Sequence, residues 1–284
     1  MWDVLPAMKI AGGAPMNVAF HANQLGLRAR MISRVGRDAL GDELLAFLNA
    51  KGVSTHLVQS DDMYPTGTVN VTLNEKGAPR YSIAQPVAWD FIQSDPAITD
   101  AVTGADAFVF GSLACRSEQT RNTLFELLDV ARLRVLDVNL RAPFYSERLL
   151  GNLLDRADMV KMNDEELPIL AGYGGVSGTE TGMMEFLRKR YRLDTLIVTR
   201  GAAGAIVLDK NGFWEHGGFR IQVEDTIGSG DAFLAAFLST FLHGGPTADC
   251  LRLACAVGAL VATKKGGTPD ISAAEIDELL HEKK

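Results

Sequence analysis

The sequence has few cysteines, few aromatic residues and no long apolar run. Its three cysteines, Cys115, Cys250 and Cys255, form no CxxC pair, and their odd number argues against a disulfide framework. A reducing cytoplasm is therefore the expected setting. The longest apolar stretch, residues 232–242, has about half the length of a membrane-spanning helix. The first ten residues, MWDVLPAMKI, lack the basic and apolar regions of a signal peptide.

Positive charge is also scarce. Lysine and arginine number 28 against 35 aspartate and glutamate residues, which gives a formal net charge of −7. This balance argues against nucleic acid and anionic membranes as partners. A bound phosphate would have to be held locally, by backbone N–H groups, a few basic side chains and a metal ion.

Several nucleotide and metal motifs are missing as well. The sequence has no Gly-Lys dipeptide, so it has no Walker A loop, and no GxGxxG run follows an expected strand. Neither HExxH nor a pair of CxxC motifs is present to indicate zinc.

The sequence does contain an alternation of short β-branched runs and longer helical patterns. Several runs are apolar almost throughout, which is typical of strands covered on both faces. The alternation predicts an α/β protein with a mostly parallel sheet, whose ligands bind at the carboxyl ends of the strands. We expect strands at 30–35, 107–112, 134–139, 159–163, 195–199 and 205–209, and helices at 15–25, 38–50, 117–131, 146–155, 164–171, 179–191, 229–242 and 247–263.

Residues 66–86 break this pattern. The run TGTVNVTLNEKGAPRYSIAQP alternates polar and apolar residues with period two, and its NEKG segment (74–77) predicts the turn of a β-hairpin. We interpret it as part of a small β lid, formed by about residues 4–12 and 60–92, over the active edge of the main sheet. Because such a sheet exposes edges and an apolar face, we expect a homodimer that pairs two lids.

The run DTIGSGD (225–231) places an acidic residue, Asp231, between a glycine turn and a long apolar stretch. Gly228 and Gly230 allow the backbone to turn tightly and to approach a ligand. The helix that follows begins with free N–H groups and a partial positive charge, and such an end binds phosphate. Two interpretations are open: Ser229 and Asp231 cap a buried helix, or Asp231 accepts the proton of a reacting hydroxyl.

The same run resembles the DTxGAGD signature of the ribokinase-like (pfkB-type) carbohydrate kinases, with Ser229 in place of the family's alanine. The resemblance implies a three-layer α/β/α sandwich with a mostly parallel central sheet and a small β-sheet lid. It implies ATP and Mg²⁺ as cofactors, with K⁺ in some members. It also implies that Asp231 is the catalytic base. The backbone of Ile227, Gly228, Ser229 and Gly230 would then form an anion hole for the transferred phosphoryl group.

Two further segments match the family at the substrate side. In GGAPMNVAFHANQLG (12–26) the resemblance implies that Gly12, Gly13 and Asn17 bind sugar hydroxyls, although an ordinary N-terminal loop has the same composition. We assign no role to His21.

The segment DVNLR (137–141) places polar residues at the end of an expected strand. The resemblance places Asn139 near the substrate and makes Arg141 a cation for the phosphoryl group, with Asp137 orienting Arg141. An ordinary turn before a capped helix is the alternative.

The nucleotide side is indicated by three segments. NDEE (163–166) matches an NxxE motif, in which Asn163 and Glu166 help to place Mg²⁺ through water, although it also reads as a helix N-cap. TRGAAG (199–204) matches a nucleotide loop, although alone it is a β-turn, and ALVATKKGGTPDI (259–271) resembles the segment that closes over adenine. The nucleotide contacts implied by the resemblance are Asn163, Thr199, Gly201, Gly204, Gly228 and Gly230. A monovalent cation would be bound with help from Asp225 and Ile227.

The resemblance covers nearly the whole chain, and segments such as FGSLACR and DVNLR look like the bacterial fructokinase branch. The implied reaction is therefore the phosphorylation of fructose to fructose 6-phosphate. Another ketose or 2-keto-3-deoxygluconate remains open as substrate, and so does a kinase-like sugar-binding protein without turnover. In the family a complete first strand leads into the segment written here WDVLP, whose Asp3 would contact the sugar. We therefore expect the natural chain to begin upstream of Met1.

Overall fold

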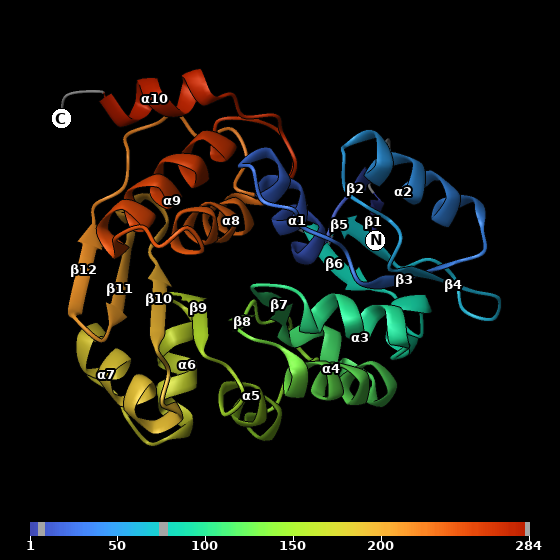
Figure 1. Ribbon diagram of the computed structural model, residues 1–284, viewed down its shortest axis with the longest axis horizontal. Helices are drawn as coiled ribbons and strands as arrows, with labels where there is room; N and C mark the ends of the chain where they lie inside the picture. Colours follow the sequence, from blue (N-terminus) through green and yellow to red (C-terminus); the bar gives the residue numbers. More distant parts are fainter. Residues whose placement is uncertain (5–8, 74–78, 282–284) are drawn as a thin grey trace.

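A six-stranded sheet forms the centre of the protein (Figure 1). The computed structural model describes residues 1–4, 9–73 and 79–281, and for 70–73 and 79–81 it describes the backbone alone. The strand order is β12-β11-β10-β9-β8-β7, in which β7 to β10 run parallel, β11 is antiparallel to β10, and β12 is antiparallel to β11. The strands are β7 (Phe108–Gly111), β8 (Arg134–Asp137), β9 (Met159–Asn163), β10 (Thr195–Thr199), β11 (Ala205–Asp209) and β12 (Gly212–His216). The predicted mostly parallel sheet is confirmed.

Helices cover both faces of this sheet, because its strands are apolar on both sides. Val135 packs in one hydrophobic core and its neighbour Leu136 in the other. The first core contains α1 (Ala14–Gln24), α8 (Ser229–Phe241), α9 (Thr247–Ala262) and α10 (Ala273–His281); the second contains α4 (Glu118–Val130), α5 (Glu147–Leu154), α6 (Glu166–Tyr173) and α7 (Glu180–Tyr191). The three-layer α/β/α sandwich is thus the fold that the sequence predicted. Within the described ranges, no helix combines the length and apolar character needed to cross a membrane.

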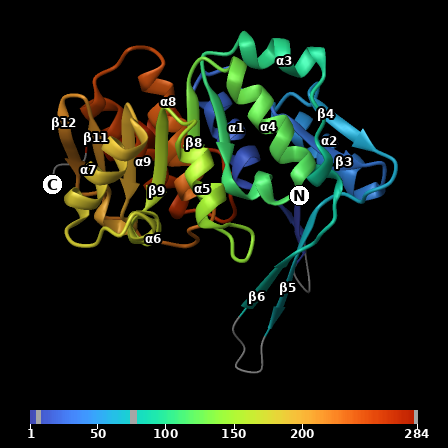
Figure 2. The same cartoon turned by 90° about the horizontal axis from the view of Figure 1, so that it is seen from below.

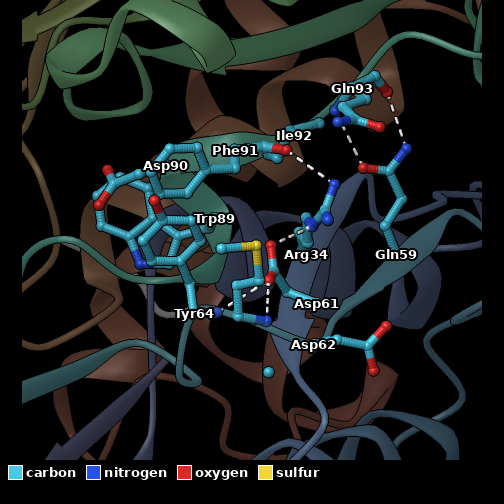
Figure 3. A network of polar contacts seen from close by, with 12 residues as sticks. Arg34, Gln59, Asp61, Asp62, Tyr64, Trp89, Asp90, Phe91, Ile92 and Gln93 are labelled. Carbon is cyan, nitrogen blue, oxygen red and sulfur yellow. Dashed lines mark hydrogen bonds and ion pairs between the residues drawn. The ribbon is translucent and has the colours of Figure 1, made fainter.

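The strand expected at 30–35 lies outside the central sheet. It is β3 (Ser33–Gly36), and it pairs in parallel with β4 (Val58–Asp61) in a two-stranded sheet beside α2 (Ala39–Ala50). Figure 3 shows what holds this small sheet: Arg34 Nε lies 2.7 Å from Asp61 Oδ2, and Arg34 Nη1 donates to the carbonyl of Phe91 at 3.0 Å. The expectation that this strand joins the main sheet was therefore wrong. Its partly exposed cation, Arg34, instead connects β4 to the short helix η1 (Ala88–Phe91), with α3 (Pro96–Thr103) following.

The predicted hairpin belongs to a four-stranded sheet of order β2-β1-β5-β6. Strands β5 (Thr68–Leu73) and β6 (Pro79–Ile83) pair antiparallel, as the alternating pattern predicted. Strand β1 (Trp2–Val4) lies between β5 and β2 (Lys9–Ala11). Figure 2 shows β5 and β6 extending away from the body. The expected turn at 74–77 and part of the 4–12 segment fall outside the described residues.

Arg116 fixes the base of the hairpin to the body. It ends the short helix η2 (Ser112–Arg116), and its side chain is 2% exposed. Its Nη2 donates to the carbonyl of Ala84 at 2.6 Å, and its Nε donates to Asp90 Oδ1 at 2.7 Å. Its guanidinium carbon lies 3.8 Å from the ring centre of Trp89. The chain that leaves β6 is therefore anchored to the body at Ala84.

Candidate active site

Polar side chains from four elements converge where β8 and β9 end and α8 begins. Asp137 ends β8, Lys161 lies in β9, Asp231 lies in the first turn of α8, and Asn17 lies in α1. Asn17 Nδ2 donates to Asp231 Oδ2 at 2.8 Å, and Lys161 Nζ lies 2.9 and 3.0 Å from the two carboxylate oxygens of Asp137. Residues up to 214 positions apart in the chain thus meet at the carboxyl edge of the sheet.

Asp231 is a buried carboxylate with a near-neutral pKa. It is 9% exposed, and burial, reinforced by the charge of Asp137, raises its pKa to about 6. Lys161, Asn17 and Arg141 act in the opposite direction. The N-cap residue of α8, Gly228, makes no side-chain cap bond, and Asp231 contacts Asn17 rather than serving as a cap. A group with this pKa is mostly ionised at neutral pH and can accept a proton.

Gly228 makes the turn before α8 possible. Its φ is 77°, and a Cβ there would lie 2.6 Å from the Cα and carbonyl oxygen of Gly267. Gly230 packs differently, because a Cβ there would lie 3.2 Å from Lys161 Nζ. Ser229 donates its hydroxyl to the carbonyl of Gly258 at 2.9 Å, which ties the turn to α9. The first helical turn has N–H groups without helical partners, so it presents donors to an anion.

Lys161 is the residue that the sequence analysis missed. Asp137 was expected to orient Arg141, but it pairs with Lys161 instead, so this expectation was wrong. Arg141 is exposed and donates to the carbonyl of Leu140 at 2.9 Å, yet it is close enough to lower the pKa of Asp231. One signal could have revealed the pair: a lysine inside an otherwise apolar strand covered on both faces requires a buried partner.

Glu166 joins the ends of two strands. Its Oε1 accepts from the N–H of Leu140 at 2.7 Å and its Oε2 from the N–H of Asn163 at 2.9 Å. Asn163 Oδ1 in turn accepts from the N–H groups of Glu165 and Glu166 at 3.0 and 2.8 Å, so the N-cap interpretation of this segment describes its local structure. Burial raises the pKa of Glu166. The turn that Glu166 holds includes Asn139, whose φ is 41°.

The donor set at this edge fits Mg²⁺ as an ion held mainly by phosphates and water. The described residues contain no group of three or more His, Cys, Asp or Glu side chains arranged for a metal. Magnesium commonly keeps several waters and uses one or two carboxylates together with substrate phosphates. Each carboxylate oxygen of Glu166 makes one hydrogen bond to the backbone, which leaves a lone pair for a metal-bound water.

Apart from Asn139, the residues predicted to bind sugar lie on the lid sheet, on α1 or in the link between them. A Cβ at Gly12 would lie 2.8 Å from Asp3 Oδ2, so the glycine and the carboxylate of β1 are in close contact. Gly13 has a φ of 122° and precedes α1, whose first turns carry Asn17. Asn17 Oδ1 is buried and has no hydrogen-bond partner among the described residues, which makes it an acceptor available to a hydroxyl. His21 Nε2 lies 3.0 Å from the carbonyl oxygen of Gly267 and holds that loop.

The predicted nucleotide loop follows β10 at the same edge. Thr199 is the register partner of Asn163, and its carbonyl accepts from the N–H of Asp164 at 3.0 Å. The loop then turns through Gly201 and Gly204, with φ of 55° and 78°. Arg200 forms ion pairs with Glu180 and Glu215, so its role is structural.

The 259–271 segment reaches the glycine turn. Asp225 Oδ1 accepts from the N–H of Ile227 and its Oδ2 from that of Gly266, both at 3.0 Å. Ile227 is 47% exposed. The loop after α9 is therefore fixed against the turn that precedes α8, where the monovalent cation was expected.

Comparisons with known proteins agree with this fold. A profile described as "pfkB family carbohydrate kinase" matches residues 7–274. A fructokinase from Salmonella typhimurium is 30% identical over 289 residues, which cover 93% of this chain and 91% of that protein. The crystal structure of a Xylella fastidiosa fructokinase with bound ATP superposes with a TM-score of 0.87 at 26% identity, covering 99% of this chain and 95% of that one. A double mutant of a Vibrio cholerae fructokinase with bound fructose, ADP and potassium has a TM-score of 0.84 at 25% identity, covering 99% and 95%.

Proposed function

The chain belongs to the pfkB family of carbohydrate kinases, and we propose that it transfers the γ-phosphoryl group of ATP to fructose, giving fructose 6-phosphate. The observation that carries the kinase function is the buried carboxylate of Asp231, which lies at the N-terminal turn of α8 with a pKa of about 6. The choice of fructose is supported by the fructokinases of similar sequence and structure.

Asp231 would act on the sugar hydroxyl. As the hydroxyl oxygen bonds to the γ-phosphorus, Asp231 takes the proton, and the bond from that phosphorus to the bridging oxygen of ADP breaks. Asn17 holds Oδ2 of the carboxylate, which leaves Oδ1 free to face the hydroxyl. The buried, unpaired Oδ1 of Asn17 is a further acceptor for the sugar. We place Asp3, Gly12, Gly13 and Asn139 around the rest of the sugar.

The transferred phosphoryl group would lie at the turn 227–230. The N–H groups of Gly228 and Gly230 would face charge that develops in the transition state, and such preorganised donors are worth several kcal/mol, on the order of 3 for one donor. The N–H of Ser229 donates to the carbonyl of Thr226 at 3.3 Å and would join them on exchanging that partner for the phosphoryl group. Arg141 would approach from the exposed side. When bound, Mg²⁺ neutralises charge on the β- and γ-phosphate oxygens. Its water ligands would reach Glu166, and a K⁺ ion would bind near Asp225 and Ile227.

The nucleotide would extend from the turn toward β10. Asn163, Thr199, Gly201 and Gly204 lie on the loops at that edge, and we assign them to the phosphates of ATP.

We also propose that the protein is a cytoplasmic enzyme, which is consistent with its three free, buried cysteines. We further propose a homodimer in which the lid sheets of two copies pair. The edges of the four-stranded sheet support the dimer, because a second copy would satisfy them.

An assay of ADP release with Mg²⁺ and a panel of sugars tests the function. We expect fructose to give the highest kcat/KM, ahead of other ketoses and of 2-keto-3-deoxygluconate. We expect Asp231→Asn to lower kcat at least about a hundredfold while the Kd for ATP stays within a factor of about two. If no sugar releases ADP but one sugar raises the melting temperature, the protein is a sugar-binding protein. A normal rate in the Asp231→Asn variant would disprove the assignment of the base.

A further inference from the structure

Lys161 is a buried cation surrounded by carboxylates. It is 7% exposed, and its Nζ contacts both oxygens of Asp137. Burial alone would lower its pKa, but the charges of Asp137, Asp231 and Glu166 outweigh burial and raise the pKa above its usual value. The lysine is therefore charged, and its charge is shared by the acidic groups of the candidate active site.

The position of Lys161 in β9 directs it toward α8. Side chains alternate along a strand, and Met159, two residues earlier, packs in the core that contains α8, while Val160 and Met162 pack in the opposite core. A Cβ at Gly230 would lie 3.2 Å from Lys161 Nζ, so the ammonium lies directly beside the helix turn. The cation thus lies between Asp137 and the turn that would receive the phosphoryl group.

A stable fold does not require this ion pair. Replacing a buried ion pair by apolar residues of similar volume is often neutral or stabilising, because desolvation offsets much of the attraction between the charges. The neighbouring positions in β9 are filled by fully buried apolar residues, Met159, Val160 and Met162. The charged pair is retained at the one position of β9 where it faces Asp231, and this placement indicates a role in the site.

Building on the proposed kinase function, we propose that Lys161 is a positioning residue of the phosphoryl-transfer site. Its ammonium neutralises Asp137 and keeps Asp231 ionised beside the turn that binds the γ-phosphoryl group. Lys161 does not take or give the reacting proton; it sets the charge state of the group that does.

The charges that face Asp231 make opposite predictions for two variants. Asp137 from β8 raises the pKa of Asp231, whereas Lys161 from β9, Arg141 from the loop after β8 and the amide of Asn17 from α1 lower it. Removing the charge of Lys161 leaves two carboxylates close together without their shared cation, so Asp231 becomes harder to ionise. Removing the charge of Asp137 frees the ammonium for Asp231, which becomes easier to ionise.

The test is the pH dependence of kcat/KM in three variants. In the wild type we expect the acid limb near pH 6. In Lys161→Met it should move up by about one pH unit or more, so that activity at pH 5 falls about tenfold while activity in alkali is unchanged. In Asp137→Asn the limb should move down, and in the double variant it should return toward the wild-type position. Lys189→Met is the control, because Lys189 is exposed at the end of α7.

Each outcome is decisive. A limb that stays at the wild-type pH in Lys161→Met, with activity lost equally at every pH, would make Lys161 merely structural. If Lys161→Met does not fold, Asp137→Asn decides, because an unmoved or raised limb contradicts the proposal. The carboxyl resonance of Asp231, followed by ¹³C NMR in the free protein, should shift in the same directions without any turnover. Shifted resonances in a protein that phosphorylates no sugar would refute the proposed function and leave intact only the finding that Lys161 sets the charge state of Asp231.

Discussion

The two ends of the candidate active site are built in different ways. At the phosphoryl end, side chains from α1, β8, β9 and α8 are buried and bonded to one another, and Gly228 packs against the backbone of Gly267. At the sugar end, Asp3 and Gly12 lie on or beside three-residue strands of the lid sheet, and Gly12 packs against the tip of the Asp3 side chain. One end is fixed by the main core, and the other can adjust.

This difference matches what each end has to do. Phosphoryl transfer is the same reaction for every sugar, and displacing a catalytic group by about 1 Å can lower its rate about a hundredfold. Sugar choice depends on a few polar contacts that can change without altering the chemistry. On the proposed function, the three-layer sandwich would carry the catalytic groups, and the small sheet would carry part of the sugar site through Asp3.

The largest expected effect is that of Gly228→Ala. A left-handed φ of 77° is strained for alanine. The new Cβ would lie 2.6 Å from backbone atoms of Gly267, which cannot move aside as a flexible side chain can. We expect the free energy of unfolding to fall by about 3 kcal/mol and kcat to fall at least about a hundredfold. Urea unfolding and the ADP-release assay measure the two effects.

Gly172→Ala is the control for this substitution. Gly172 lies in α6, and nothing lies within 4 Å of the position of its Cβ, so alanine there should be neutral or slightly stabilising. If Gly228→Ala is as stable and as active as Gly172→Ala, then the turn before α8 is not held rigidly by Gly267, and the contrast between the two ends of the site disappears.

Gly12→Ala should have a smaller and more selective effect. Its Cβ would lie 2.8 Å from Asp3 Oδ2, and a side-chain carboxylate can rotate away where a backbone cannot. We expect the KM for the sugar to rise about tenfold as Asp3 leaves its position, with the KM for ATP and the unfolding free energy nearly unchanged. Steady-state kinetics with each substrate varied in turn measure this. Equal increases in both KM values would show that the sugar end does not adjust on its own.

The sequence predicted the central layers well because their signals are local. Runs such as TLIVT (195–199) are apolar on both sides, and β10 has the same bounds. The hairpin of β5 and β6 followed from its period-two alternation. Shorter or more polar elements gave weaker signals, and β4, β12, α3 and α10 were not expected. Strand β3 was assigned to the wrong sheet, because the contacts of Arg34 with Asp61 and Phe91 join segments that are distant in the sequence.

The residues of the site divide in the same way. Asp231 was proposed from the sequence because a carboxylate directly after Gly-Ser-Gly is conspicuous. Lys161 was missed because its partner Asp137 lies 24 positions away, although its place inside an otherwise apolar strand is a local signal that it needs a buried partner. The sequence analysis paired Arg141 with Asp137 because both lie in one five-residue segment. In the structure the partner of Asp137 is set by the register of β8 and β9, which places Asp137 beside Lys161.

The smallest expected effect is a pH-dependent gain in stability in Asp231→Asn. Because burial raises the pKa of Asp231 to about 6, above its value of about 3.8 in the unfolded chain, folding opposes ionisation of this group. The free energy of unfolding of the wild type therefore decreases as pH rises from about 4 to about 6, because Asp231 resists ionisation in the folded protein. Asparagine carries no charge and avoids this decrease, and its amide oxygen can still accept the hydrogen bond from Asn17. We expect the variant to be more stable than the wild type by about 1 to 2 kcal/mol at pH 8 and equally stable near pH 4, measured by urea unfolding of the free protein. Asp3→Asn should give a smaller difference, because the carboxylate of Asp3 is only half-buried. If the free energies of unfolding of the wild type and Asp231→Asn change with pH in parallel, then Asp231 ionises as readily in the folded protein as in the unfolded chain. The phosphoryl end would then hold no carboxylate with a raised pKa.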